Sequence, residues 1–462
     1  MRVKRAAALL GATVLVASSG AAKAQDTPPP TPKPAPTQED YDRLKKQIDE
    51  LNAKVDAAKK KDEEQRTADA EKLGEIDKKA SSAFDLADAL RWGTTHLFFA
   101  GTAHVDYTYT LPARNTTQRS SSVFSAGLEL DAIWKVNDWI YFEGGADFEL
   151  NSQNSTDTSL ALCDVSFVLN DYMVLRGGLM PTAFSRFKET LDPAWINKMV
   201  DAPLLEAIVP DTTVGIEARG AVPLGPMKML YALYMFNDPI LNTDDPVLNG
   251  TVSFDNYQGF DDIPGFGAKV GFLLLPELEV GGAFMWSKVG NRGTDFRQTD
   301  LFALDLYARF QKKTEIGSFD AQAEWAMQHV RRATYIGIQN GVDAAGNPIQ
   351  TILFGPLRYT NEKQSGYFQV SYRPTQAENE IVKNFEFVVR TDWLGLPKRA
   401  AQGNNTDTNR VAAGIDYWFT PSIVLKAEYE YASIYGHTNL QSGTKTKDTE
   451  SHTLTFQVGM GF

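Results

Sequence analysis

The chain has 462 residues, a formal net charge of −12 and a single cysteine, Cys163. An acidic chain with dispersed basic residues is a poor ligand for nucleic acid, so the charge argues against DNA or RNA partners. One cysteine excludes an intramolecular disulfide, whereas aromatic residues (11 %) and glycine (35 residues) are plentiful.

Residues 1–24 are predicted to be a secretory signal peptide. The sequence MRVKRAAALLGATVLVASSGAAKAQ has a basic start, an apolar run and the small-residue pattern Ala22-Lys23-Ala24 before Gln25. Its apolar run is too short for a spanning helix, and no later stretch approaches the roughly 20 apolar residues that such a helix needs. The mature protein is therefore expected to leave the cytoplasm.

Two segments without strand character follow. Residues 25–38 contain DTPPPTPKPAPTQ and are predicted to form an extended, proline-rich linker. Residues 39–91 are predicted to be helical, with a short coiled-coil seam of about two heptads. Apolar residues recur there at alternating spacings of three and four, at Tyr41, Leu44, Ile48, Leu51 and Val55. A lone solvated helix is the alternative, because the seam is short.

Residues 92–462 consist of repeated segments in which apolar and polar residues alternate. In SVFSAGLELDAIWKV one face carries Phe124 and Leu130, whereas the other carries Glu129 and Asp131. Tight turns are predicted at Asn137-Asp138, Asn170-Asp171, Pro276-Glu277 and Pro421-Ser422. Long loops are predicted near 181–211, 237–263, 290–299, 330–364 and 436–449.

Short turns that alternate with long loops are typical of bacterial outer-membrane barrels. About 16 strands are counted, so the predicted fold class is all-β: a transmembrane antiparallel barrel of about 16 strands, preceded by a periplasmic coiled-coil helix. An even strand number places both termini in the periplasm. A soluble sandwich of this length would normally split into several domains, and no internal linker separates such domains.

The strand ends and the C-terminus support the barrel. Aromatic residues at strand ends are expected to form the girdle at the membrane interfaces: Trp134, Trp139, Tyr172, Trp286, Trp393, Trp418 and Phe419. The final segment, ESHTLTFQVGMGF, alternates up to Phe462. This ending is similar to the signal that barrel assembly machinery reads, so that machinery is an expected partner.

The stretch LRGGLMPTAFSRFKETLDPAWINKMV, followed by DTTVGIEARG, resembles the phosphate-selective porin O and P family. In that family a glycine-rich strand runs into a folded loop and then into the next strand. The resemblance implies a homotrimer of water-filled channels, in which this loop narrows each pore.

The residues expected at the constriction or in the lumen carry both charges. The basic candidates are Arg176, Arg186, Lys188, Lys198, Arg219, Lys269, Arg309, Arg373, Arg390 and Lys426. The acidic residues set against them are Glu189, Asp192, Glu217, Asp305, Asp320, Glu324, Glu386, Asp392 and Asp416. Phosphate selectivity needs a dense ladder of positive donors, and a mixed wall predicts weak selectivity instead.

The predicted function is an outer-membrane porin for passive diffusion of small hydrophilic solutes or ions, including anions such as phosphate, in contact with outer-membrane lipid. One alternative is a barrel lipase or protease, although none of the five histidines lies in a nucleophile motif. Another is a tether between the outer membrane and the periplasm. No enzyme activity, cofactor or metal is predicted, and Asp244-Asp245 and Asp261-Asp262 are only a weak calcium signal.

Overall fold

The computed structural model describes residues 91–92, 95–111, 120–150, 155–244, 250–254, 263–290, 298–342, 348–397, 406–437 and 448–462. The predicted signal peptide, the linker and the helical region up to residue 90 lie outside these ranges. Arg91, the last residue of the predicted helical region, belongs to the short strand β1. No helix in the described ranges is both long and apolar enough to cross a membrane.

Strands dominate the described chain, with two short α-helices and one 3-10 helix. The strands are β1 (Arg91–Trp92), β2 (Thr95–Leu111), β3 (Ser121–Asn137), β4 (Ile140–Leu150), β5 (Thr156–Asn170), β6 (Met173–Pro181), β7 (Thr212–Leu224), β8 (Met227–Phe236), β9 (Ile240–Leu241), β10 (Val252–Ser253), β11 (Gly265–Leu275), β12 (Leu278–Val289), β13 (Thr299–Lys313), β14 (Ser318–Val342), β15 (Pro348–Arg373), β16 (Phe385–Gly395), β17 (Thr406–Thr420), β18 (Ile423–Gly436) and β19 (Thr449–Gly461). The helices are α2 (Arg186–Thr190), η2 (Leu204–Ile208) and α3 (Glu380–Lys383).

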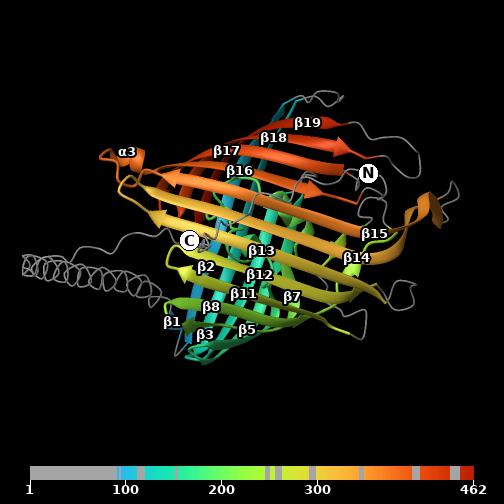
Figure 1. Ribbon diagram of the computed structural model, residues 1–462, viewed down its shortest axis with the longest axis horizontal. Coiled ribbons are helices and arrows are strands. Elements are labelled where there is room, and N and C mark those ends of the chain that lie inside the picture. Colours follow the sequence, from blue (N-terminus) through green and yellow to red (C-terminus); the bar gives the residue numbers. More distant parts are fainter. Residues whose placement is uncertain are drawn as a thin grey trace, which may run out of the picture. The chain divides into compact units, whose positions relative to one another are not determined.

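Sixteen antiparallel strands, β2 to β8 and β11 to β19, close into a barrel (Figure 1). Each strand pairs with its neighbour in sequence, β8 pairs with β11, and β19 pairs with β2 to close the ring. β1 adds a short pairing to β2, and β9 pairs with β10 apart from the barrel. The predicted fold class, an all-β barrel of about 16 strands, is confirmed.

The C-terminal residue takes part in this closure. The backbone N–H of Phe462 donates to the carbonyl of Gly101 at 3.1 Å, and the Gly101 N–H donates to the Phe462 carbonyl at 3.0 Å. A Cβ at position 101 would lie only 2.8 Å from the Phe462 ring, so glycine leaves room for that ring. The alternating C-terminus thus ends on the seam between the last and the first long strand.

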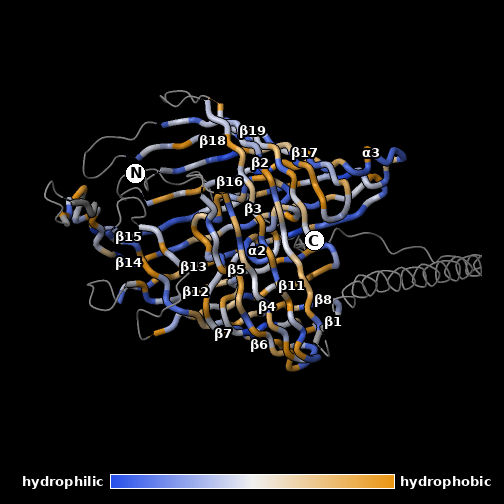
Figure 2. Tube along the Cα trace, turned by 180° about the vertical axis from the view of Figure 1, so that it is seen from behind, coloured by the Kyte–Doolittle hydropathy of each residue, from blue (hydrophilic) through white to orange (hydrophobic). Residues whose placement is uncertain are grey.

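The barrel is apolar outside and charged inside, the reverse of a soluble sandwich. Phe124 and Leu233 point outward with 73 % and 59 % of their surface exposed, whereas Asp305 and Lys426 face inward with 0 % and 1 % exposed. Figure 2 shows this alternation of apolar and polar residues along the strands. Exposed aliphatic side chains that ring a closed sheet are the pattern of a lipid-facing surface.

The two ends of the barrel differ, as the turn pattern predicts. One end has the short connections, including the two-residue turns after β11 and β17, and it also carries α3 between β15 and β16. The other end has the long connections after β6, β8 and β18. We call these the turn end and the loop end.

Two of the predicted turns are displaced by one residue. Asn137 is the last residue of β3, and its side-chain oxygen accepts hydrogen bonds from the backbone N–H groups of Trp139 and Ile140 at 3.0 and 2.8 Å. Asn170 ends β5 in the same way and accepts from Tyr172 at 2.9 Å. The asparagine side chain organises the turn while its backbone still belongs to the strand.

The predicted loop at 330–364 is wrong, because β14 and β15 continue far beyond their neighbours at the loop end (Figure 1). Bulges between Val330 and Ala333 and between Tyr335 and Gly337 break the alternation in the sequence. The inner face of this hairpin is also covered, since Asn361 donates to the carbonyl of Gly250 at 2.6 Å. A strand that contains bulges and is packed on both faces does not show a simple alternation of apolar and polar residues.

The prediction that Trp418 belongs to the outer aromatic girdle is also wrong. Its indole N–H donates to Glu386 inside the barrel at 3.1 Å, and the Arg373 guanidinium lies 5.5 Å from its ring centroid. Trp139, Tyr172 and Phe419, in contrast, are exposed on strand ends or turns.

The lipid-facing surface predicts a depth-dependent penalty for charge. Leu233→Arg, in the middle of β8, should lower the free energy of unfolding by about 2–4 kcal/mol, because the guanidinium would lie in hydrocarbon. Leu224→Arg, at the turn end of β7, should cost only about 0–1 kcal/mol. Urea titration of the protein folded in phospholipid vesicles measures both, and equal costs would contradict the assignment of this surface to lipid.

Candidate functional site

The segment between β6 and β7, residues 182–211, folds into the barrel, and we call it the inner loop. It contains α2 and η2, and its contacts reach strands on the far side of the ring, from β11 to β19. Several of its apolar side chains are fully buried, including Phe184, Phe187 and Leu205. Met199 packs against Val388 and Ala412 of the opposite wall. Burial of these side chains draws the loop across the lumen.

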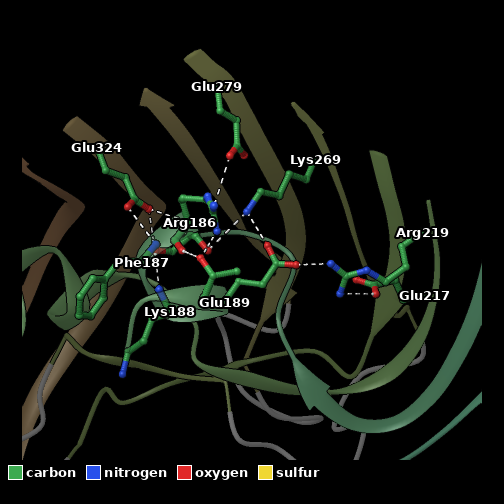
Figure 3. A network of polar contacts seen from close by, with 11 residues as sticks. Arg186, Phe187, Lys188, Glu189, Glu217, Arg219, Lys269, Glu279 and Glu324 are labelled. Atoms are coloured by element: carbon green, nitrogen blue, oxygen red, sulfur yellow. Dashed lines mark hydrogen bonds and ion pairs between the residues drawn. The ribbon is translucent and has the colours of Figure 1, made fainter. Parts of the chain in front are cut away.

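Glu324 of β14 holds the start of α2 (Figure 3). One carboxylate oxygen accepts from the Ser185 hydroxyl at 2.6 Å and from the Arg186 N–H at 2.7 Å. The other accepts from the Phe187 N–H at 3.0 Å and from the Tyr367 hydroxyl at 3.2 Å. Because Glu324 is 2 % exposed, these bonds satisfy a buried charge, and they use the N–H groups that a helix start leaves unpaired.

Three ion pairs also hold α2 to the barrel wall. Glu189 pairs with Lys269 of β11 at 2.7 Å and with Arg219 of β7. Arg186 pairs with Glu279 of β12 at 3.2 Å. Burial raises the pKa of Glu189, but the charges of Lys269 and Arg219 outweigh it, so the pKa lies below its usual value. Glu189 is therefore an anion held between two cations.

Lys198 anchors the middle of the inner loop. Its ammonium group donates to Glu386 and to the Ser371 hydroxyl, both at 2.6 Å, and lies 3.4 Å from Asp320. Asp320 also pairs with Arg309 of β13 at 2.8 Å. The predicted residues Lys198 of the inner loop, Asp320 of β14 and Arg309 of β13 are thus brought together.

The following part of the loop is held by Lys426 and Glu428 of β18. Lys426 donates to the carbonyls of Ala194, Asn197 and Met199, the last at 3.2 Å. Glu428 accepts from the Val200 N–H at 2.5 Å. The Lys426 ammonium group binds backbone carbonyls and the Glu428 carboxylate binds a backbone N–H group. Both kinds of polar group in the loop backbone are therefore held by β18.

Arg390 and Arg410 form a further anchor. Both guanidinium groups donate to the carbonyl of Ala202 in the loop and pair with Asp392 between them, at 2.9 Å for Arg390 and 2.7 Å for Arg410. Asp201, Glu428 and Glu430 place carboxylate oxygens within 4.8 Å of one another beside this anchor. Arg410 already pairs with Glu430 at 3.0 Å, so a guanidinium engages one of these three carboxylates.

Two predicted residues lie apart from the loop anchors. Arg176 of β6 pairs with Asp164 at 2.7 Å and with Glu143 at 3.3 Å, on the wall next to the loop's origin. Arg373 lies at the turn end, where it donates to the carbonyl of Lys383 at 3.0 Å. The structure therefore does not bring Arg373 to the constriction. Of the loop carboxylates considered for calcium, Asp245, Asp261 and Asp262 lie outside the described residues.

The wall opposite the anchors is acidic. We call the inward carboxylates of β2 to β5 the acidic wall: Asp106, Glu129, Asp131, Glu143, Asp147, Glu149, Asp157 and Asp164. Strand register places three pairs of them directly opposite each other: Glu129 faces Asp147, Glu143 faces Asp164, and Glu149 faces Asp157. Like charges in directly opposed positions repel each other. These side chains, Asp164 excepted, keep part of their surface accessible, so water remains in contact with them.

The edge of the inner loop that faces this wall is also acidic. Asp192 and Asp211 lie within electrostatic range of Glu129. Lys188 sits behind them, 3.1 Å from Asp192 and also paired with Glu206, with only 6 % of its side chain exposed. In Figure 3 the Lys188 side chain points away from the Glu189 and Glu324 anchors. The carboxylates of Asp192 and Asp211, with 34 % and 56 % of their side chains exposed, are instead accessible from the lumen.

The electrostatics of this edge follow from its crowding. Burial lowers the pKa of Lys188, but the three surrounding carboxylates outweigh it and raise the pKa above its usual value. Burial raises the pKa of Asp192 to about 6, against the opposing charge of Lys188. Lys188 therefore stays charged, whereas Asp192 titrates in a physiologically accessible range.

No family model and no curated protein matches the chain. Among solved structures, the anion-selective porin from Comamonas acidovorans aligns with a TM-score of 0.50 at 9 % identity, over 80 % of this chain and 100 % of that chain. The outer membrane channel DcaP of Acinetobacter baumannii aligns at 0.49 and 11 %, over 80 % and 97 %. The chain therefore has the 16-strand barrel fold of general outer-membrane porins.

Sequence reasoning missed the acidic wall as a site. Alternation predicts a polar face for carboxylates such as Glu129 and Asp131, but which carboxylates of β3 and β4 face each other depends on strand register, and alternation alone does not give it. Direct carboxylate pairs such as Glu129 and Asp147 are visible only after β3 and β4 are aligned through their turn.

Removing the carboxylate of Glu324 should loosen the start of the inner loop. Glu324→Ala leaves the Ser185, Arg186 and Phe187 donors without their acceptor, at a cost of about 3 kcal/mol. Hydrogen exchange of a peptide covering residues 182–190 should then be about 100-fold faster, by the factor of ten per 1.4 kcal/mol. Glu362→Ala, on the outer face of β15, is the matched control, and unchanged exchange in Glu324→Ala would refute this anchor.

Proposed function

We propose that the chain is a bacterial outer-membrane porin, whose water-filled channel lets small hydrophilic solutes diffuse passively and favours cations. The observation that carries the proposal is the placement of charge. The acidic wall faces the acidic edge of the inner loop, so a solute in the space between them meets carboxylates from both sides. Rings of carboxylates favour cation passage.

Arg176 pairs with Glu143 and Asp164 of the acidic wall, but the other basic residues do not offset this field, because they are engaged elsewhere. Lys198 pairs with Glu386, Lys269 with Glu189 and Arg410 with Asp392. A paired and buried cation contributes little to the field in the open lumen. Phosphate or another anion would need several free positive donors, and the geometry favours cations over the anions expected from the family resemblance. Anion selectivity is a stated property of the Comamonas porin, which shares 9 % identity with this chain.

An enzyme of the barrel type is a weaker proposal. In the part of the chain that the structure describes, the histidine contacts are with Asp106 for His104, Glu362 for His329, Asp407 for His437 and Tyr429 for His452. None of these four contacts is with a serine or cysteine that a hydrolase would use as its nucleophile.

The remaining parts of the proposal concern assembly. A homotrimer, insertion by the barrel assembly machinery through Phe462, and a periplasmic location of the turn end and of the N-terminal helix are proposed together with the porin function. A tether role would be an additional property of residues 26–90. Deleting those residues should leave conductance unchanged, so the two roles are separable.

Ion selectivity tests the acidic wall. In planar bilayers under a salt gradient, the wild-type reversal potential should show a several-fold preference for potassium over chloride. Glu129→Gln/Asp147→Asn should bring the preference close to unity, because it removes one directly opposed pair. Glu362→Gln, on the outer face, should leave selectivity unchanged. An anion preference in the wild type would overturn the proposal.

Acidic pH should weaken the cation preference. Because burial holds the pKa of Asp192 at about 6, its charge is lost as pH falls from 7.5 to 5. The raised pKa also means that the ionised form disfavours the folded loop above pH 6, and this cost disappears as the group protonates. Selectivity should therefore fall between pH 7.5 and 5 in the wild type.

Asp192→Asn is the variant that tests this assignment. It should start from a lower cation preference at pH 7.5 and should show a smaller step between pH 7.5 and 5. A step of the same size in both proteins would assign the titration to another group.

A further inference from the structure

A polar groove of about 730 Å³ lies on the outer face of the barrel near the loop end. It forms where β16 stops at Gly395 while β15 continues, so the extended β15 makes one side. The ends of β17 and β18 make the other side, with Asp407 and Tyr435. Its depth and its position outside the lumen make it a site separate from the channel.

The alternation along β15 establishes that the groove faces outward. Tyr359, Asn361 and Lys363 are buried on the inner face, whereas Arg358 and Glu362 between them are exposed. The same strand is apolar further toward the turn end, where Phe368 and Val370 point outward. The outer face of one strand therefore changes from apolar to polar along its length.

This change occurs at a belt of aromatic residues. Trp393 and Tyr435 line the groove with 39 % and 45 % of their surface exposed, and Val389 and Val411 lie on the apolar side of them. Aromatic side chains of this kind mark the boundary between hydrocarbon and headgroups. The groove consequently lies at the headgroup level of the leaflet on the loop end.

Two arginines carry the chemistry. Arg332 of β14 and Arg358 of β15 line the groove, both are exposed, and neither forms an ion pair within the described ranges. The groove's carboxylates each face a histidine instead, Glu362 with His329 at 3.7 Å and Asp407 with His437 at 2.9 Å. Exposed guanidinium groups that form no ion pair in the described part of the chain fit phosphate at headgroup depth, because they bind it in bidentate geometry.

We infer that this groove binds the phosphorylated headgroup of an outer-leaflet lipid, with Arg332 and Arg358 as its phosphate ligands. The inference rests on the proposed outer-membrane function, since that location supplies such lipids on the loop end. The aromatic side chains contact the upper acyl region, and the guanidinium groups reach the phosphate above it. A second copy of this chain is a poorer occupant, because the groove is polar and carries free positive charge.

Native mass spectrometry of the detergent-solubilised full chain tests the site with bis-phosphorylated lipid A as the probe. Arg332→Gln/Arg358→Gln should bind it at least 10-fold more weakly than the wild type. Lys312→Gln/Lys313→Gln removes two exposed charges at the turn end and should bind like the wild type. Equal affinity of the groove variant and the wild type would overturn the assignment.

Two further arms define the ligand. Dephosphorylated lipid A should bind the wild type as weakly as the groove variant binds the phosphorylated lipid; equal binding of both lipids would show that phosphate is not recognised. Inorganic phosphate at the same concentration should not displace the lipid, and displacement would identify a free-anion site. Bilayer conductance of the same variants should equal that of the wild type, so loss of channels in all proteins would instead refute the porin function.

Discussion

The structure depends on one constraint: a sheet that spans hydrocarbon cannot leave backbone N–H and C=O groups unpaired. Each unsatisfied group costs several kcal/mol in lipid, so the edges of the sheet must meet. Pairing of β19 with β2 and of β8 with β11 removes both edges. Once the ring is closed, side chains have only two destinations, lipid or lumen, and the period of two assigns every strand residue to one of them.

Closure also creates a problem that the inner loop solves. A ring of sixteen strands encloses more space than inward side chains can fill. The inner loop fills one side of it and brings its own apolar cluster around Phe184 and Leu205. Its anchors include the basic residues of β11 to β18, whose ion pairs and hydrogen bonds hold the loop in place. The acidic residues of β2 to β5 have no such loop over them. A chain with both charges in its lumen thus presents mainly one of them to a passing solute.

Alternation was enough to predict the barrel, the strand count and the inward direction of residues such as Lys269, Arg390 and Glu324. It was enough because each of these lies in a regular stretch of its strand, away from any bulge, with lipid on the outer side. It failed for β14 and β15, where bulges shift the register, and for Trp418, whose aromatic nature suggested the girdle although its position in β17 places it inside.

The candidate site was less predictable than the fold, for a different physical reason. Lys198 and Glu386 are 188 positions apart, and the pairing of Lys426 with loop carbonyls has no signature in residue type. Contacts between a folded loop and a distant wall are set by the path of the loop, which depends on how its apolar residues pack. Local sequence patterns therefore do not predict that path.

The opposing treatment of charge on the two sides of the lumen follows from local solvation. Beneath the inner loop a lone charge would lose its water, and removing one partner of a buried pair costs about 3–5 kcal/mol, so Glu324, Lys198 and Lys426 each have several partners. At the acidic wall, water screens the carboxylates: two charges about 5 Å apart repel by only about 1 kcal/mol in bulk water. The barrel can therefore tolerate Glu129 opposite Asp147. Mobile cations that enter from solution lower the remaining repulsion. This wall depends on water and counterions for its stability, so the proposed cation preference and the stability of this side share one physical origin.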